Sequence, residues 1–127
     1  MGIFDYFKKS SQQEKPAKEE YWSLSTNEEK IVNPTWEQVK QAVGEAVPEK
    51  ALFASLGYYH SDSEIEVIQA IQLTQGINEF RLEALPPNVG KIFINNGLSL
   101  DETVKFFEEF YKYKRVVGYE NWPTEKV

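Results

Sequence analysis

The sequence predicts an α+β domain in which an antiparallel sheet of about four to five strands packs against two helices, with a short N-terminal helical segment in front. Two stretches, one near each end of the chain, have the residues of a capping box that starts a helix. Between them lie short apolar runs separated by turn residues, which is the pattern of strands. Because the turns are short, consecutive strands are expected to pair antiparallel.

The folded domain is expected to cover residues 21–127, and residues 1–20 to lie outside it. Residues 10–20 form a polar linker of Ser, Gln, Lys and Glu around one proline. In front of the linker, Ile3, Phe4 and Phe7 fall on one face of a short helix. Such a helix either docks on the domain or frays; the alternative is a peptide that binds a membrane surface or a partner protein.

Length and charge restrict the function. A chain of 127 residues is expected to form one domain, and the absence of cysteine excludes disulfides and thiol catalysis. Positive and negative charges balance in residues 1–20, so the whole net charge of −6 comes from residues 21–127. An acidic domain binds nucleic acid poorly but suits a basic protein partner. With no signal peptide and no run long enough to cross a bilayer, the chain is expected to be cytoplasmic.

Two helices are expected, at residues 35–45 and from Ser99 onward. Thr35 can cap the first, with Gln38 at the reciprocal position, while Asn33 followed by proline offers a second start. Ser99 and Glu102 form the second capping box. The apolar face of the first helix is expected to comprise Trp36, Val39, Ala42 and Val43. The stripe of the second is expected to comprise Leu100, Val104, Phe107 and Tyr111, with Phe106 and Phe110 beside it.

Strands are indicated at Tyr21–Ser25, Lys30–Val32, 50–59, 64–74, 77–85 and 91–94, and residues 116–122 form a tail that is a further candidate. In the strand at 50–59, Leu52, Ala54 and Leu56 share one face. For the hairpin around Gln75 and Gly76, a two-residue loop pairs Ile71 with Phe80 and Val67 with Ala84, which gathers most apolar residues on one side. A three-residue loop pairs Ile71 with Glu79 and is less consistent with the pattern.

In the preferred register four carboxylates, Glu64, Glu66, Glu79 and Glu83, share the face opposite the apolar one, together with Arg81. The simplest interpretation is a solvated sheet face. The alternative is a binding surface for a basic partner, where the charges steer association. Tyr58, Tyr59 and Asp62 in the adjoining turn would then supply anchors for the partner.

No residue pattern indicates catalysis or a cofactor. His60 is the single histidine of the chain, and with Asp62 it is more typical of a solvated turn than of an acid–base pair. The alternation of His60, Asp62, Glu64 and Glu66 does not have the ligand spacing of a metal site. We therefore expect no catalytic residue, no cofactor and no metal.

Three matching pieces give the sequence a family resemblance: Asn33-Pro34-Thr35-Trp36-Glu37 opening the first helix, the acid-tipped helix at 100–107, and the closing Glu120-Asn121-Trp122. Together with the apolar strands between them, this pattern resembles a family of bacterial immunity proteins of polymorphic toxin systems. These small proteins are encoded beside toxins, many of them nucleases or nucleic-acid deaminases. The resemblance covers about two-thirds of the chain and does not include residues 1–20.

The resemblance implies that the protein inhibits a cognate toxin domain by binding at or near its active site, and the charge argument independently favours a basic partner. A second hypothesis is a non-enzymatic adaptor or structural domain that docks on a protein or membrane through residues 1–9. An enzyme is the third hypothesis, and it requires an essential His60 or a carboxylate pair.

Overall fold

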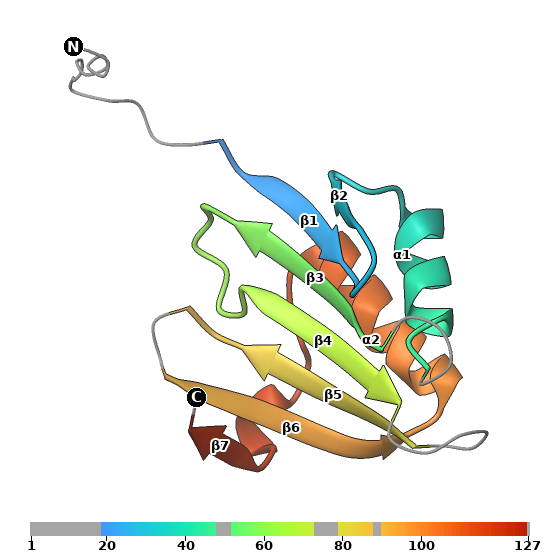
Figure 1. Cartoon of the computed structure of the whole chain (residues 1–127). Helices are drawn as coiled ribbons and strands as arrows, with labels where there is room; N and C mark the ends of the chain where they lie inside the picture. The colour runs from blue at the N-terminus through green and yellow to red at the C-terminus, as the bar shows by residue number, and fades with distance from the viewer. Residues whose placement is uncertain (1–18, 48–51, 73–78, 88–89, 127) are drawn as a thin grey trace, which may run out of the picture.

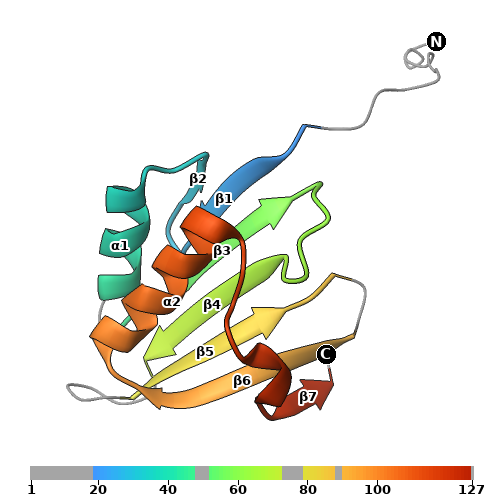
Figure 2. The same cartoon turned by 180° about the vertical axis from the view of Figure 1, so that it is seen from behind.

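The computed structural model describes residues 19–47, 52–72, 79–87 and 90–126. They form one antiparallel sheet with both helices on the same side (Figures 1 and 2). The strand order is β2-β1-β3-β4-β5-β6-β7. The elements are β1 (Tyr21–Ser25), β2 (Lys30–Val32), α1 (Trp36–Gly44), β3 (Ala54–Tyr59), β4 (Val67–Gln72), β5 (Phe80–Leu85), β6 (Lys91–Leu98), α2 (Leu100–Tyr113), the 3₁₀ helix η1 (Tyr119–Asn121) and β7 (Thr124–Lys126).

The α+β class, the antiparallel sheet and the two helices are confirmed, but the predicted number of four to five strands is wrong because the sheet has seven. The two outermost strands, β2 and β7, have only three residues each. The strand indicated at Lys30–Val32 is β2, whereas β7 is too short to give a clear alternating pattern. The predicted strand in the tail is also displaced. Residues 119–121 form η1, and the strand follows Pro123. Short edge strands discourage pairing with other chains. The predicted N-terminal helical segment lies outside the described residues.

Both helices start as the sequence predicts. At α1 the backbone N–H of Thr35 donates to Gln38 Oε1 at 2.9 Å, and the N–H of Gln38 donates to Thr35 Oγ1 at 3.2 Å. Ser99 and Glu102 form the equivalent box at α2, with distances of 2.9 and 3.1 Å. Asn33 has a different role from the helix start proposed above. With a φ of 52°, it exchanges hydrogen bonds with the backbone of Trp22 and so extends the pairing of β1 beyond β2.

The helices cover the sheet through a few fully buried side chains. Val39 and Val43 of α1 are buried as predicted. In α2 the buried residues are Thr103, Phe107 and Phe110, whereas Leu100, which was predicted to belong to the apolar stripe, is 42% exposed. Thr103 fits the core because its hydroxyl donates to the carbonyl of Ser99 at 2.8 Å. Leu52 is likewise exposed rather than in the core, because β3 begins two residues later.

The predicted register of the β4–β5 hairpin is wrong by one residue. Val67 pairs with Leu85 and Ile71 with Arg81, instead of Ala84 and Phe80. A one-residue slip exchanges the two faces of one strand relative to the other. Ile68 and Ala70 of β4, rather than Val67 and Ile71, therefore join Phe80, Leu82 and Ala84 under the helices. The loop at residues 73–78 lies outside the described residues.

None of the helices in the described ranges covers the opposite side of the sheet, which we call the open face (Figure 1). The pairing places alternate residues of each strand there. Ser23, Gly57 and Val67 follow one another across β1, β3 and β4, and Ser25, Ser55, Gln69 and Glu83 form the next row. This face therefore combines small, apolar and charged residues.

Candidate protein-binding site

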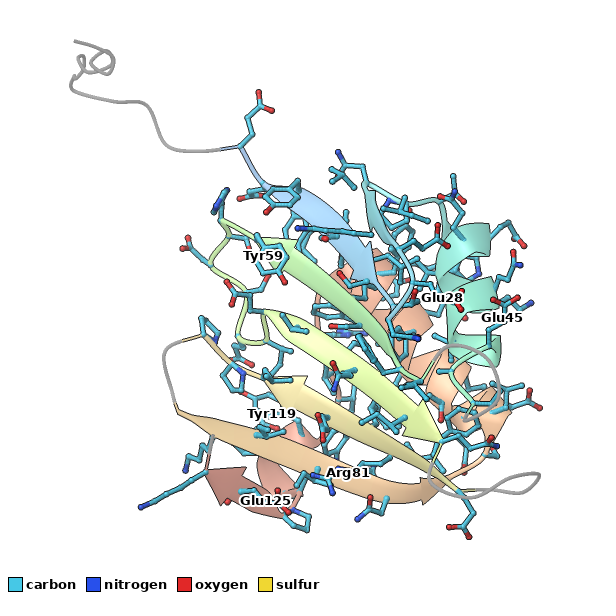
Figure 3. The ribbon with its side chains drawn as sticks, in the orientation of Figure 1. Glu28, Glu45, Tyr59, Arg81, Tyr119 and Glu125 are labelled. Carbon is cyan, nitrogen blue, oxygen red and sulfur yellow. The ribbon has the colours of Figure 1, made fainter. Side chains whose placement is uncertain are left out.

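Tyrosines and carboxylates gather at one end of the sheet, where β1 begins and β3 turns toward β4. We call this region the tyrosine end. The chain approaches the sheet here through Glu19 and Glu20. From far along the sequence, η1 adds Tyr119, which is labelled together with Tyr59 in Figure 3. The tyrosine end comprises Glu19, Glu20, Tyr21, Tyr58, Tyr59, His60, Asp62, Glu64, Glu66 and Tyr119.

Tyr58 lies on the helix side of the tyrosine end. Its ring packs against Trp22 with centroids 4.4 Å apart, and Lys114 Nζ lies 4.8 Å from the ring centre. The Tyr58 hydroxyl donates to the carboxylate of Glu20. That hydrogen bond is the main reason why the pKa of Tyr58 is raised, with burial and the charge of Glu20 adding to it. The ring thus accepts a cation on its face while its hydroxyl is held by an anion.

Tyr59 lies on the open face, because neighbouring strand residues point to opposite sides. Its ring lies 5.4 Å from that of Tyr21, its partner across β1 and β3. It also lies over Gly57, where an added Cβ would be 2.5 Å from Tyr59 Cζ. Burial raises the pKa of Tyr59, and the nearby carboxylate of Glu66 raises it further. In the turn that leads into β4 the backbone does not alternate regularly, since Ile65 and Ile68, three residues apart, both enter the core.

Tyr119 comes from η1 and lies on the helix side, where its ring packs against Phe93 at 5.0 Å. Burial is the largest cause of the raised pKa of Tyr119, followed by the charges of Glu64 and Glu120 and a hydrogen bond to Glu64. Tyr119, Tyr21 and Glu20 also belong to the site, although none of them was predicted from the sequence. If the pairing of β1 with β3 had been predicted, it would have placed Tyr21 opposite Tyr59. No local pattern in the sequence connects Tyr119 with Glu64.

His60 has a backbone partner rather than a carboxylate partner in the structure. It adopts a φ of 64°, and its Nδ1 lies 2.9 Å from the carbonyl oxygen of Glu19. Its ring meets that of Tyr21 edge-on at 5.4 Å. His60 thereby joins the turn after β3 to the residues that precede β1. Within the described ranges, no group of three or more His, Asp or Glu residues is arranged to hold a metal ion.

The seven residues predicted to bind a partner do not form one surface. Five of them lie at the tyrosine end: Tyr58 and Tyr59 finish β3, and Asp62, Glu64 and Glu66 follow in the turn to β4. Tyr58 and Tyr59 point to opposite sides of the sheet. Glu79 immediately precedes β5, at the other end of that strand, roughly 20 Å away at about 3.3 Å per residue. Glu83 is buried. It accepts hydrogen bonds from Arg81 at 2.8 Å and Gln69 at 3.2 Å. The shared acidic face was predicted from a register that the structure does not adopt.

Two hollows lie elsewhere on the surface. One, of about 290 Å³, lies beside α2 and is lined by Glu102, Lys105, Phe106, Glu109 and Val117. The other, of about 200 Å³, lies between α1 and the β1–β2 hairpin, where Glu28, Glu29 and Glu45 stand among its lining residues. Glu28 and Glu45 are labelled in Figure 3, well away from Tyr59. In the part of the chain that the structure describes, no helix is long and apolar enough to cross a membrane.

Comparisons with known proteins do not assign the chain to a family. No family model matches it, and neither a curated protein nor a solved structure matches it significantly. The interpretation of the site therefore depends on its geometry and on the residues of the chain itself.

Proposed function

We propose that this protein is a non-enzymatic, cytoplasmic binding protein whose partner is a basic protein, and that it acts as an immunity protein that neutralises a toxin domain. The observation that carries the proposal is the gathering of tyrosines and mostly exposed carboxylates at the tyrosine end. The pKa values of Tyr58, Tyr59 and Tyr119 are raised, chiefly by a hydrogen bond for Tyr58 and by burial for Tyr59 and Tyr119, and nearby glutamate charges add to each increase.

The carboxylates of the tyrosine end form no ion pair with any described residue, although Glu20 accepts a hydrogen bond from the Tyr58 hydroxyl. The ion pairs among the described residues lie elsewhere, joining Arg81 to Glu83 and Glu125, Lys112 to Glu108, and Arg115 to Glu109. Lys114 is a described cation close to this end, and its ammonium group lies over the ring of Tyr58. Its position illustrates how a lysine or arginine of a partner would bind between a tyrosine ring and a glutamate.

Tyrosines and carboxylates make complementary contributions to such a complex. Tyrosine supplies a large contact area at low entropic cost and is enriched among the residues that dominate interface energies. Carboxylates steer a cationic partner and mainly affect the association rate. The same charges repel nucleic acid phosphates, so the proposed partner is a protein.

The proposal is tested by co-expressing this chain with the C-terminal domain of the protein encoded directly upstream. Restored growth and a stable complex on gel filtration would support immunity. A neighbour without toxicity, or the absence of a complex, would contradict it. Deleting residues 1–20 serves as a second arm. Immunity survives this deletion under the present proposal, whereas the adaptor hypothesis requires residues 1–9.

Charge reversal then tests the site. Glu66→Lys and Glu64→Lys are each expected to slow association about tenfold at low salt and to reduce its salt dependence, with little change in dissociation. Glu37→Lys is the matched control, because Glu37 is an exposed glutamate in the first turn of α1, outside the tyrosine end. Equal effects of all three substitutions would show that only the net charge matters and that the tyrosine end is not the site.

A further inference from the structure

A row of apolar side chains crosses the centre of the open face. Val67 of β4 lies beside Leu85 of β5, and Gly57 of β3 lies on the other side of Val67. Because Glu83 pairs with Ile94, continued alternation brings Ile92 of β6 next to Leu85. Val67, Leu85 and Ile92 are each partly exposed. Together with Tyr59 they form what we call the apolar row.

Tyr59 belongs to this row because its ring lies over Gly57. The position lacks a side chain, and the phenol ring of Tyr59 fills the space. Gly57 is buried although it faces away from the helices. The ring therefore continues the apolar surface from β4 onto β3. The row crosses four neighbouring strands, a distance of roughly 14 Å at about 4.8 Å per strand.

Negative charge borders the row at both ends. Glu66 directly precedes Val67, and its backbone N–H donates to the carbonyl of Leu85 at 2.9 Å. Glu125 of β7 pairs with Ile92. Two described cations face this side of the sheet: Arg81, and Lys30 at the β2 edge, opposite Ser25. Arg81 lies beside the row and is shared between Glu83 at 2.8 Å and Glu125 at 3.3 Å (Figure 3). Beside the row, three carboxylates, those of Glu66, Glu83 and Glu125, therefore stand against one guanidinium. The open face is therefore apolar along its centre and acidic at its margins.

We infer that the apolar row is the surface on which the basic partner docks. The occupant is an amphipathic basic segment whose apolar side chains contact Val67, Leu85 and Ile92 while its lysines or arginines reach Glu66 and Glu125. A helix of about ten residues spans the row, at roughly 1.5 Å per residue. This inference rests on the proposed function and names the contact surface for it.

Charge complementarity favours this face over the apolar hollow beside α2. There Glu109 is paired with Arg115 at 2.7 Å, and Glu102 accepts from the N–H of Ser99 at the helix cap. Lys105 adds a positive charge to the same lining. The hollow thus has no net attraction for a cation, whereas beside the apolar row three carboxylates stand against the single guanidinium of Arg81.

Opposite charges at one position test the inference. In the complex with the upstream C-terminal domain, Leu85→Lys is expected to weaken binding by about thirtyfold or more, because it removes apolar contact and adds repulsion. Leu85→Glu removes the same contact without repelling the partner and is expected to cost several-fold less. Val117→Lys is the control, since Val117 is an apolar residue of the α2 hollow and is 62% exposed.

A measurement on the unmodified chain avoids any dependence on folding of the variants. Side-chain methyl signals are followed by NMR while a synthetic amphipathic helical peptide of leucine and lysine is added, with a glutamate-for-lysine peptide as control. Shifts at Val67, Leu85 and Ile92 with the lysine peptide alone would support the inference. Shifts centred on Val117, or equal shifts with both peptides, would overturn it.

The two proposals fail in different ways. If the unmodified chain forms no complex with the upstream domain, the proposed function is wrong and this inference falls with it. If the complex forms but Leu85→Lys and Leu85→Glu leave its affinity unchanged, the inference alone is wrong. If Val117→Lys is the substitution that weakens the complex, the hollow beside α2 is the contact surface instead.

Discussion

Replacing Gly57 by alanine tests the contact between this residue and Tyr59. A Cβ at position 57 would lie 2.5 Å from both Cζ and Oη of Tyr59, far inside ordinary contact distance. The atoms in the way belong to the far end of a side chain, so the ring can move while the strand stays in place. We expect Gly57→Ala to displace the Tyr59 ring from the apolar row and to leave the sheet intact.

The magnitude follows from two opposing effects. Alanine is more favourable than glycine inside a strand by about 0.5–1 kcal/mol, because glycine loses more conformational freedom on folding. Forcing the ring out of its packed position costs about 1–3 kcal/mol. Gly57→Ala is therefore expected to destabilise the protein by roughly 0.5–2 kcal/mol. In a Tyr59→Ala background the same change meets no ring and is expected to be stabilising by about 0.5–1 kcal/mol.

A double-mutant cycle measured by urea unfolding separates these effects. The difference between the two backgrounds is the coupling energy, expected to be about 1–3 kcal/mol. Tyrosine absorbance provides a second readout, since moving the ring out of its buried position and away from Glu66 lowers the pKa of Tyr59 toward its ordinary value. If Gly57→Ala changes the free energy of unfolding equally in both backgrounds, Tyr59 does not cover Gly57 and the apolar row ends at Val67.

Three further predictions concern the core, a helix cap and pH. Phe107→Ala removes a fully buried ring and is expected to lower the free energy of unfolding by about 3–5 kcal/mol in urea titrations. Ser99→Ala removes the acceptor for the N–H of Glu102 and is expected to cost about 1 kcal/mol by the same measurement. Because the pKa values of Tyr58, Tyr59 and Tyr119 are raised in the folded state, these residues contribute their full stabilisation at pH values below the ordinary tyrosine pKa of about 10. Because the folded state keeps these protons longer, stability is expected to fall as the pH rises above about 10. A melting temperature that does not decrease there would contradict the assigned environments.

The helix starts were predictable because a capping box is local. Thr35 with Gln38, and Ser99 with Glu102, place donors and acceptors three residues apart, and no distant contact is needed to recognise them. The face that α2 turns toward the sheet was harder to predict from the sequence. Thr103 was not predicted to be buried, because its burial depends on a hydrogen bond to Ser99. The burial predicted for Leu100 was too high, because Leu100 precedes the part of the helix that meets the sheet.

The candidate site was predictable only where its residues are neighbours in sequence. The turn from Tyr58 to Glu66 was identified from its aromatic and acidic residues, and the structure keeps these residues at one end of the sheet. Contacts between residues far apart in the sequence could not be predicted from it. Glu20 meets Tyr58 because β1 pairs with β3, and Tyr119 meets Glu64 because η1 follows α2 back along the sheet.

The β4–β5 register was predicted wrongly because β4 has apolar residues on both of its faces, and the same feature supplies part of the proposed binding surface. One face of β4 has the apolar residues Val67 and Ile71, and the other has Ile68 and Ala70. Either face could therefore pack against the core, so the apolar pattern does not select one register. A strand of this kind is typical of a sheet that is covered on both sides. In the described chain the helices bury Ile68 and Ala70, while Val67 and Ile71 remain partly exposed on the open face. If a partner covers the open face, both apolar faces of β4 are explained: Ile68 and Ala70 pack in the core, and Val67 and Ile71 contact the partner.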